Sequence, residues 1–257
     1  RFFYSIQLAE GGKNVSLQFI IGSSGIGKTH YACEQIIRES MENPQHLYYI
    51  IVPEQFTMQT QKNVVEMHPG KGILNIDVLS FQRLAYRIFE ETGGAREVLL
   101  DDTGKSMVLQ KLVQQHRKNL PYLGSQMNKP GYLDEVKSLI SEFMQYDIRE
   151  EELQDMLGKT GEDSLLHMKM QDVGVLYQAF LQYLEGHYMT GEGVMDALKK
   201  AIPFSDKLKK SVLLLDGFTG FTPVQMNVIR ELLNVCDKVL VTVTMDAGEN
   251  PLQLGKP

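Results

Sequence analysis

The chain has 257 residues, of which 43% are hydrophobic and 23% are charged, a composition typical of folded globular proteins and not of disordered ones. We expect no membrane span and no exported protein but a cytoplasmic one, because no apolar stretch approaches roughly 20 residues and residues 1–14 lack a signal-peptide core. The net charge of −6 argues against a general affinity for nucleic acid. Two cysteines, Cys33 and Cys236, are too few for a disulfide framework or a metal cluster, so both are expected to be buried thiols.

The outer parts of the chain alternate strand-like apolar runs with helical patterns. The predicted strands are residues 17–21, 47–52, 73–79, 212–215 and 239–243. Helices are predicted at residues 30–40, 54–65, 81–91 and 223–235. Ser80 and Thr222 stand at helix starts, where a hydroxyl accepts from the first free backbone N–H groups. Continuous apolar strands that alternate with helices predict an α/β fold, a parallel sheet with helices on both faces.

The middle of the chain is different. Residues 102–202 contain helical patterns and no convincing strand, with breaks at Pro121, at Pro130 and between residues 158 and 161. Four methionines of this part, Met144, Met156, Met168 and Met170, are expected to fill a core. We therefore predict an all-helical subdomain, residues 102–202, inserted into an α/β domain of residues 15–101 and 203–257. Residues 1–14 are predicted to be an N-terminal extension.

A complete phosphate-binding loop follows the first predicted strand. Its residues are Gly22, Ser23, Ser24, Gly25, Ile26, Gly27, Lys28 and Thr29. Glycines let successive backbone N–H groups point at phosphate oxygens, the lysine reaches the β- and γ-phosphates, and the threonine hydroxyl holds Mg²⁺. The helix that follows adds its positive N-terminal end to the same anion site. The predicted cofactors are therefore ATP and Mg²⁺.

Asp216 directly follows the predicted strand 212–215, at the end of the sheet where ligands of parallel sheets collect. An acidic residue in this position helps to hold magnesium, so Thr29 and Asp216 are the predicted metal-site residues. Hydrolytic enzymes of the helicase kind carry a glutamate next, which activates the attacking water, but this chain has Gly217. We therefore predict nucleotide binding without effective hydrolysis and assign no catalytic residue. Glu54 is the nearest substitute carboxylate.

Several segments of the chain resemble motifs of a known protein family. The phosphate loop and the segments 52–57 (VPEQFT), 78–84 (VLSFQRL) and 215–225 (LDGFTGFTPVQ) occur in the order of a superfamily 1 helicase front domain. More closely, the chain resembles the N-terminal part of the AddB family, the helicase-like nuclease subunit of the bacterial AddAB recombination-repair complex. The resemblance implies a RecA-like P-loop NTPase fold and a role in DNA repair. It also implies a heterodimer with an AddA-like motor subunit.

The same resemblance places single-stranded DNA contacts at Gln55, Phe56, Ser80 and Phe81. A core position for the two phenylalanines is the alternative. Family members are far longer, and their nuclease domain and four-cysteine iron–sulfur cluster lie near the C-terminus, so we expect this chain to be a fragment without them.

Other differences from the motifs of an active helicase also predict that ATP is not hydrolysed. Residues 1–16 offer no adenine-contacting glutamine segment, Thr219 and Gly220 replace motif residues, and strand 239–244 ends in Met245-Asp246-Ala247. Two other functions stay open: an active P-loop ATPase or small-molecule kinase, and an interaction module with an empty, vestigial loop.

One basic cluster, Lys199, Lys200, Lys207, Lys209 and Lys210, is expected to be a solvated surface.

Overall fold

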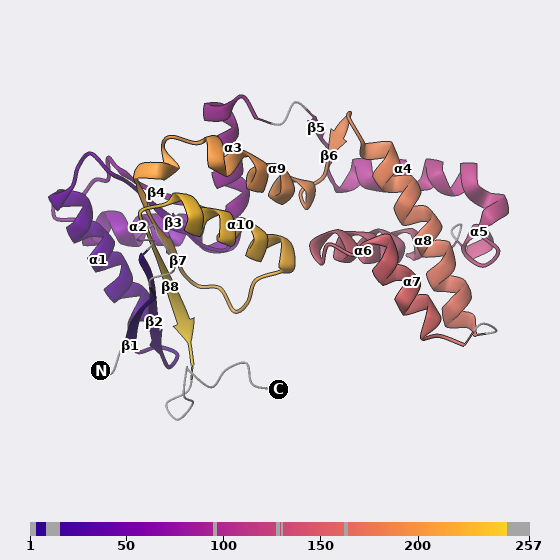
Figure 1. The fold of residues 1–257 in the computed structure, drawn as a ribbon, viewed down its shortest axis with the longest axis horizontal. Coiled ribbons are helices and arrows are strands. Elements are labelled where there is room, and N and C mark those ends of the chain that lie inside the picture. The colour runs from indigo at the N-terminus through magenta and orange to yellow at the C-terminus, as the bar shows by residue number, and fades with distance from the viewer. Residues whose placement is uncertain are drawn as a thin grey trace. The chain divides into compact units, whose positions relative to one another are not determined.

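The computed structural model describes residues 4–8, 16–94, 97–126, 129, 131–161 and 164–245. The chain divides into two compact units (Figure 1). The sheet unit comprises residues 1–94, 197–221 and 225–257, and the helical unit comprises residues 95–196 and 222–224. Within the described ranges, no helix has both the length and the apolar character that crossing a membrane requires.

A six-stranded sheet forms the centre of the sheet unit, in the order β1-β2-β8-β7-β3-β4. These strands are β1 (Tyr4–Leu8), β2 (Ser16–Gly22), β3 (Leu47–Ile51), β4 (Ile76–Leu79), β7 (Ser211–Leu215) and β8 (Lys238–Thr244). β1 pairs antiparallel with β2, and every other pair is parallel. The predicted α/β class with a mostly parallel sheet is therefore confirmed.

Helices supply the rest of this unit's core. They are α1 (Lys28–Glu42), α2 (Thr57–Met67), α3 (Phe81–Thr92) and α10 (Pro223–Val235), with 3₁₀ turns at Glu54–Phe56, Ile202–Phe204 and Leu208–Lys210. Ala32 and Ile36 of α1 and Val64 of α2 pack in one cluster with Ile50 and Leu214 of the sheet. The intervening strand residues are buried as well, because the sheet is apolar on both faces.

The predicted strands agree with the structure except in the third run and at the start of the chain. β4 begins at Ile76 and not at residue 73, since Leu74 is exposed and Asn75 donates its side-chain amide to the carbonyls of Ser40 and His46. β1 lies in the segment predicted to be an extension.

The helical unit contains α4 (Asp102–His116), a 3₁₀ turn Arg117–Asn119, α5 (Leu123–Gln126), α6 (Tyr132–Gln145), α7 (Glu150–Gly158) and α8 (Leu165–Leu184). α9 (Gly193–Ala201) leads from this unit into the sheet unit. The central apolar cluster of the helical unit includes Leu109, Ile140, Leu176 and Phe180. The prediction of no strand in residues 102–202 was wrong by one short element, because β6 (Tyr188–Met189) pairs in parallel with β5 (Val98–Leu99). The sequence of this part has a helical pattern over residues 163–185 that corresponds to α8, and its first residue, Asp163, lies outside the described residues.

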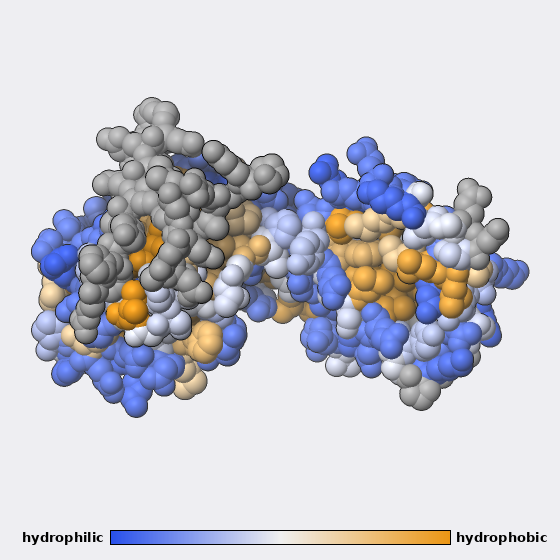
Figure 2. Space-filling model, turned by 90° about the horizontal axis from the view of Figure 1, so that it is seen from below, coloured by the Kyte–Doolittle hydropathy of each residue, from blue (hydrophilic) through white to orange (hydrophobic). Residues whose placement is uncertain are grey.

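The methionine prediction holds only in part. Met144 and Met170 pack against the apolar cluster of the helical unit, whereas Met156 and Met168 are exposed. Figure 2 shows hydrophobic side chains gathered on the surface of this unit, and its exposed apolar residues include Leu165, Leu166 and Leu181.

Two buried polar contacts fix the helical unit. Asp172 on α8 is fully buried, and one of its carboxylate oxygens accepts from the backbone N–H groups of Tyr122 and Leu123 at 2.9 and 2.6 Å. Lys105 of α4 forms a buried ion pair with Glu192 at 2.9 Å. Burial pushes the pKa of Glu192 upward, but the hydrogen bond and charge of Lys105, together with hydrogen bonds from the backbone and Thr190, outweigh it, so that pKa lies below its ordinary value. Both contacts join segments that are far apart in sequence.

Candidate functional site

The glycine-rich loop connects the carboxyl end of β2 to α1. Gly25 and Gly27 have φ of 75° and 93°, which glycine adopts without the strain that a side chain would impose. A Cβ built on either residue meets nothing within 4 Å, so the loop is open on that side. A Cβ at Gly22, in contrast, would collide with the Ile26 side chain, which folds over the start of the loop. The local order of strand, loop and helix is the one predicted from the sequence.

Lys28 begins α1 and its side chain turns back into the loop. Its Nζ donates to the Ser23 carbonyl at 2.8 Å, and the side chain is largely buried. Burial lowers the pKa of Lys28, and the nearby Asp216 carboxylate opposes that shift. The ammonium group is therefore held beside the loop by a backbone contact.

Asp216 is the point at which three parts of the site converge. It is only 4% exposed and lies at the carboxyl end of β7, where its backbone N–H donates to the Ile51 carbonyl at 3.0 Å. The Thr29 hydroxyl donates to Asp216 Oδ1 at 3.0 Å, and the Thr242 hydroxyl donates to the same oxygen at 2.6 Å. The structure thus brings together Thr29 and Asp216, the two residues predicted for a metal.

Sequence reasoning missed Thr242. Its position on β8 follows from the register of β7 and β8, in which Leu215 lies opposite Val241. The available signal was a hydroxyl residue within an otherwise apolar strand next to the strand that carries Asp216. That register is a long-range pairing, which the local pattern did not reveal.

Gly217 adopts a φ of 76°, so the chain turns in a left-handed conformation directly after Asp216. The turn directs Phe218 and Phe221 onto Phe81, with ring centroids 5.5 Å apart for Phe81 and Phe218 and 4.9 Å apart for Phe218 and Phe221. A glutamate at this position would have to adopt the same left-handed backbone, which costs a non-glycine residue about 1–2 kcal/mol.

The four residues predicted to contact DNA lie at the carboxyl ends of β3 and β4 but differ in exposure. Gln55 and Phe56 are exposed in the 3₁₀ turn after β3, and Phe56 is 48% exposed. Ser80 is buried and caps α3, with its hydroxyl accepting from the Arg83 N–H at 3.3 Å. Phe81 is only 5% exposed and belongs to the core. Of the two aromatic rings, only Phe56 presents a surface on which a base can stack.

Glu54, the substitute carboxylate, is engaged elsewhere. It forms an ion pair with Arg83 at 3.0 Å on the surface.

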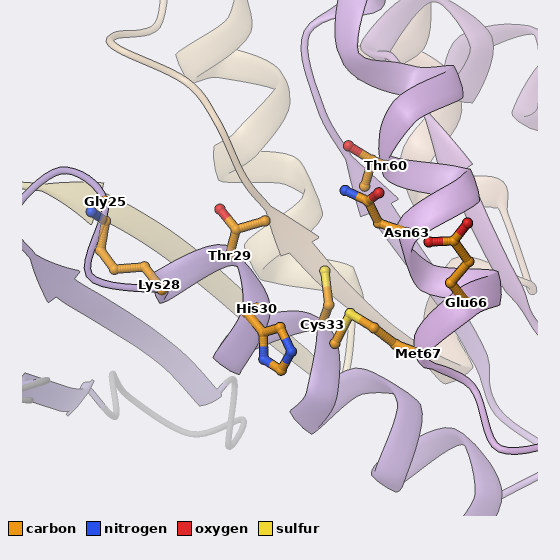
Figure 3. A pocket seen from close by; sticks show the side chains of 10 residues that line it. Gly25, Lys28, Thr29, His30, Cys33, Thr60, Asn63, Glu66 and Met67 are labelled. Atoms are coloured by element: carbon orange, nitrogen blue, oxygen red, sulfur yellow. The ribbon is translucent and has the colours of Figure 1, made fainter.

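A cavity of about 550 Å³ opens beside the loop (Figure 3). Gly25, Lys28 and Thr29 line it on the side of the loop, and the polar residues Thr60, Asn63 and Glu66 line it from α2. Cys33 lies in its wall, where burial and then the charge of Asp216 raise the pKa of the thiol to about 12. As predicted, both cysteines are free and buried. Among the described residues, no group of three or more His, Cys, Asp or Glu side chains is placed to hold a metal.

The comparisons with known proteins agree with the motifs. A family model described as "ADDB, N-terminal" matches residues 19–254. Three similar proteins are each named as a subunit of an ATP-dependent helicase/deoxyribonuclease. The protein from Lachnoclostridium phytofermentans is 45% identical over 235 residues, which cover 91% of this chain and 20% of that protein. Those from Alkaliphilus metalliredigens and Desulforamulus reducens are 33% and 32% identical, and the matches cover 90% and 95% of this chain and 20% and 21% of the relatives. The chain therefore spans about a fifth of the length of these relatives, and it belongs to the AddB N-terminal family.

Proposed function

We propose that this chain is the nucleotide-binding N-terminal part of an AddB-type subunit of an ATP-dependent helicase/deoxyribonuclease, and that it binds ATP with Mg²⁺ without effective hydrolysis. The observation that carries the proposal is the 3.0 Å hydrogen bond between Thr29 and Asp216, which are 187 positions apart in the chain. Two separate motifs of a phosphate site, each expected at the end of a different strand, lie in contact.

The residues fit the cofactor. The open glycine loop offers backbone N–H groups to phosphate oxygens, and Lys28 contributes a positive charge beside them. Thr29 and Asp216 would hold Mg²⁺, which completes its shell with water and phosphate oxygens in sites of this kind. The bound ion would neutralise charge on the β- and γ-phosphates. The parallel sheet with the loop on β2 and Asp216 on β7 supports a RecA-like P-loop fold, with the helical unit as an insertion.

The absence of hydrolysis is inferred from the position after Asp216. Gly217 has no side chain to orient a water molecule, and the Glu54 carboxylate pairs with Arg83. Positioning of the nucleophilic water is the step that such a carboxylate serves. The site therefore has the groups for binding and lacks the group for turnover.

The wider role rests on the relatives. Their names describe one subunit of a helicase/deoxyribonuclease, so we infer an AddA-like partner and a role in DNA repair and recombination. A nuclease centre and an iron–sulfur cluster would belong to the remaining part of the longer relatives. Of the four residues predicted to contact DNA, Gln55 and Phe56 are exposed and would make that contact.

Calorimetric titration with ATP and Mg²⁺ tests the proposal. We expect saturable binding by the wild type, loss of binding in Lys28→Ala and no change in Lys159→Ala, which removes an exposed lysine of the helical unit. Phosphate release should stay at background in all three.

Two outcomes would contradict the proposal in different ways. Steady phosphate release that disappears in Lys28→Ala would indicate an active ATPase. A wild type that binds no nucleotide would indicate an interaction module with an empty loop.

A further inference from the structure

The segment between α9 and β7 is buried at every third residue. Ile202, Ser205, Leu208 and Ser211 are all fully buried, and the two residues between each pair of them are exposed. Ile202–Phe204 and Leu208–Lys210 are 3₁₀ turns, in which residues three apart share a side. Ser205, between the two turns, has an extended backbone, so it is the three-residue period of burial that sorts the exposed residues into two rows. One row, the basic row, contains Phe204, Lys207 and Lys210, and the other contains Pro203, Asp206 and Lys209.

Polar contacts hold this segment in place. Ser205 Oγ donates to Glu91 Oε2 at 2.6 Å, and the Lys207 backbone N–H donates to Glu91 Oε1 at 3.0 Å. Ser205 Oγ also accepts from the Leu208 N–H, and Ser211 Oγ donates to the Leu208 carbonyl. The Glu91 carboxylate is thus occupied by a hydroxyl and a backbone donor. These contacts fix the backbone of the segment, so the exposed side chains of both rows start from defined positions.

The two rows differ in charge. Lys209 pairs with Asp206 at 2.8 Å, so the second row has no net charge. The hydrogen bond and charge of Lys209 lower the pKa of Asp206, and the more distant Lys210 contributes less to the same shift. Among the described residues, no carboxylate lies within ion-pair distance of Lys207 or Lys210. Phe204 is 75% exposed at the head of the same row. The basic row therefore combines an exposed aromatic ring with two ammonium groups that form no ion pair within the described part of the chain.

We propose that the basic row binds single-stranded DNA, with Phe204 stacking on a base and Lys207 and Lys210 contacting phosphates. An aromatic ring beside positive charges is the common arrangement for binding single strands without sequence preference, because every base offers a π-face. Lys199 and Lys200, on the last turn of α9, precede this segment in the chain and are also basic. The chain carries a net charge of −6, so a polyanion is repelled over most of the surface and attracted here.

This contact is separate from the nucleotide site. β7 begins at Ser211, directly after the basic row, and Asp216 follows the opposite end of the same strand. The two sites thus lie at the amino and carboxyl ends of the sheet. Binding of DNA at the basic row requires neither Lys28 nor a bound nucleotide.

Fluorescence anisotropy with a labelled oligothymidine and the 257-residue chain tests this inference. We expect Phe204→Ala to weaken binding about tenfold. Lys207→Gln with Lys210→Gln should lower the slope of log K against log salt by about 1.4, at roughly 0.7 for each phosphate contact on a single strand. Lys209→Gln is the control, since it removes one positive charge from the neutralised row where the double variant removes two from the basic row, and its slope should equal that of the wild type. Phe204→Leu should bind like Phe204→Ala, because it keeps apolar area without a ring.

Several outcomes would overturn the inference. The first is a wild type that does not bind at low salt, and the second is an equal loss in Lys209→Gln. A third is displacement of the DNA by polyglutamate at equal charge concentration, which would indicate an acidic protein segment as the ligand. Lys28→Ala should leave DNA binding unchanged, so failure of the proposed nucleotide site would be seen separately.

Discussion

Two hydroxyl groups share one oxygen of the Asp216 carboxylate, and they come from different elements. Thr29 approaches from α1, whereas Thr242 approaches from β8. A buried carboxylate is stabilised by such donors, and losing one leaves part of its desolvation cost uncompensated. Thr242 is therefore as much a part of the site as the residues of the glycine loop.

Replacing Thr242 by valine removes the donor and keeps the shape of the side chain. We expect Thr242→Val to lower the free energy of unfolding by about 1–3 kcal/mol and to weaken the Mg²⁺-dependent part of ATP affinity. Urea denaturation and calorimetry with and without Mg²⁺ measure the two effects. Thr242→Ser should recover both, and Thr244→Val, the same change at an exposed position of β8, should alter neither. Equal ATP affinity in Thr242→Val and the wild type would contradict the role in the site.

Gly217 matters in two ways: its backbone has a positive φ, and its lack of a side chain removes the carboxylate that would activate water. We expect Gly217→Glu to leave phosphate release at background, because the left-handed turn and not only the missing carboxylate separates this site from a hydrolytic one. The variant should lose about 1–2 kcal/mol of stability from the strained φ. Gly220→Glu, three residues further on at a position without positive φ and with open space, is the control and should be nearly neutral. ATP turnover by Gly217→Glu would show that the turn relaxes.

The sequence was informative about residues that end strands and poor about residues that meet through register. Thr29 and Asp216 are predicted at one site because each follows an apolar run, and they lie 3.0 Å apart. Thr242 depends on the pairing of β7 with β8, which no local pattern specifies. The burial of Phe81 also depends on packing against Phe218 and Phe221, which lie far along the chain.

At the scale of elements, the Lys105–Glu192 pair joins α4 to the segment before α9. Its side chains are only 8% and 10% exposed, so removing one partner leaves the other charged and buried. We expect Lys105→Met to lower the free energy of unfolding by about 3–5 kcal/mol. Lys105→Met with Glu192→Leu should recover most of that loss, and Lys159→Met, which breaks an exposed pair, should cost under about 1 kcal/mol. A double variant no more stable than the single one would contradict this account.

Asp172 fixes α5 to α8, and it makes the stability of the helical unit depend on pH. Burial raises the pKa of this carboxyl group, and the two backbone donors only partly oppose the shift. The folded state therefore holds this proton more tightly than the unfolded state, and the contribution of Asp172 to stability falls as pH rises above the unfolded pKa of about 3.9.

Asp172→Asn removes this dependence. The difference in unfolding free energy, variant minus wild type, should grow as pH increases from about 4 and level off above the folded pKa. Denaturation at a series of pH values measures it, with Asp155→Asn on exposed α7 as the control. A difference independent of pH would contradict the expected shift.

The prediction of strands was wrong where a strand is too short to show a periodic pattern, or where its alternation of apolar and polar residues was not used. Residues 4–8, YSIQL, alternate apolar and polar side chains and so carried a strand signal. β5 and β6 have two residues each, too few for any periodicity. β4 starts later than predicted because the Asn75 side chain donates to two backbone carbonyls. These are tertiary contacts, which the local sequence pattern does not reveal.

For the whole molecule, the two apolar clusters are built from separate residues of the two units. We expect scanning calorimetry to show two responses. ATP with Mg²⁺ at about 100 times Kd should stabilise the sheet unit by about 2.7 kcal/mol, whereas Lys105→Met should lower only the transition of the helical unit. A single transition that both changes move together would show that the chain unfolds as one cooperative body.

The strand order has a further consequence, for association between molecules. An unpaired edge strand offers its N–H and C=O groups to any other chain and can start aggregation. At one border β4 is short, with four residues, and it carries the exposed Asp77–Arg87 ion pair. At the other border the five-residue β1 is the edge strand, and it pairs antiparallel with the seven-residue β2, which would otherwise be the longer edge. The first strand of the chain thus shields the strand that leads into the phosphate loop from self-association.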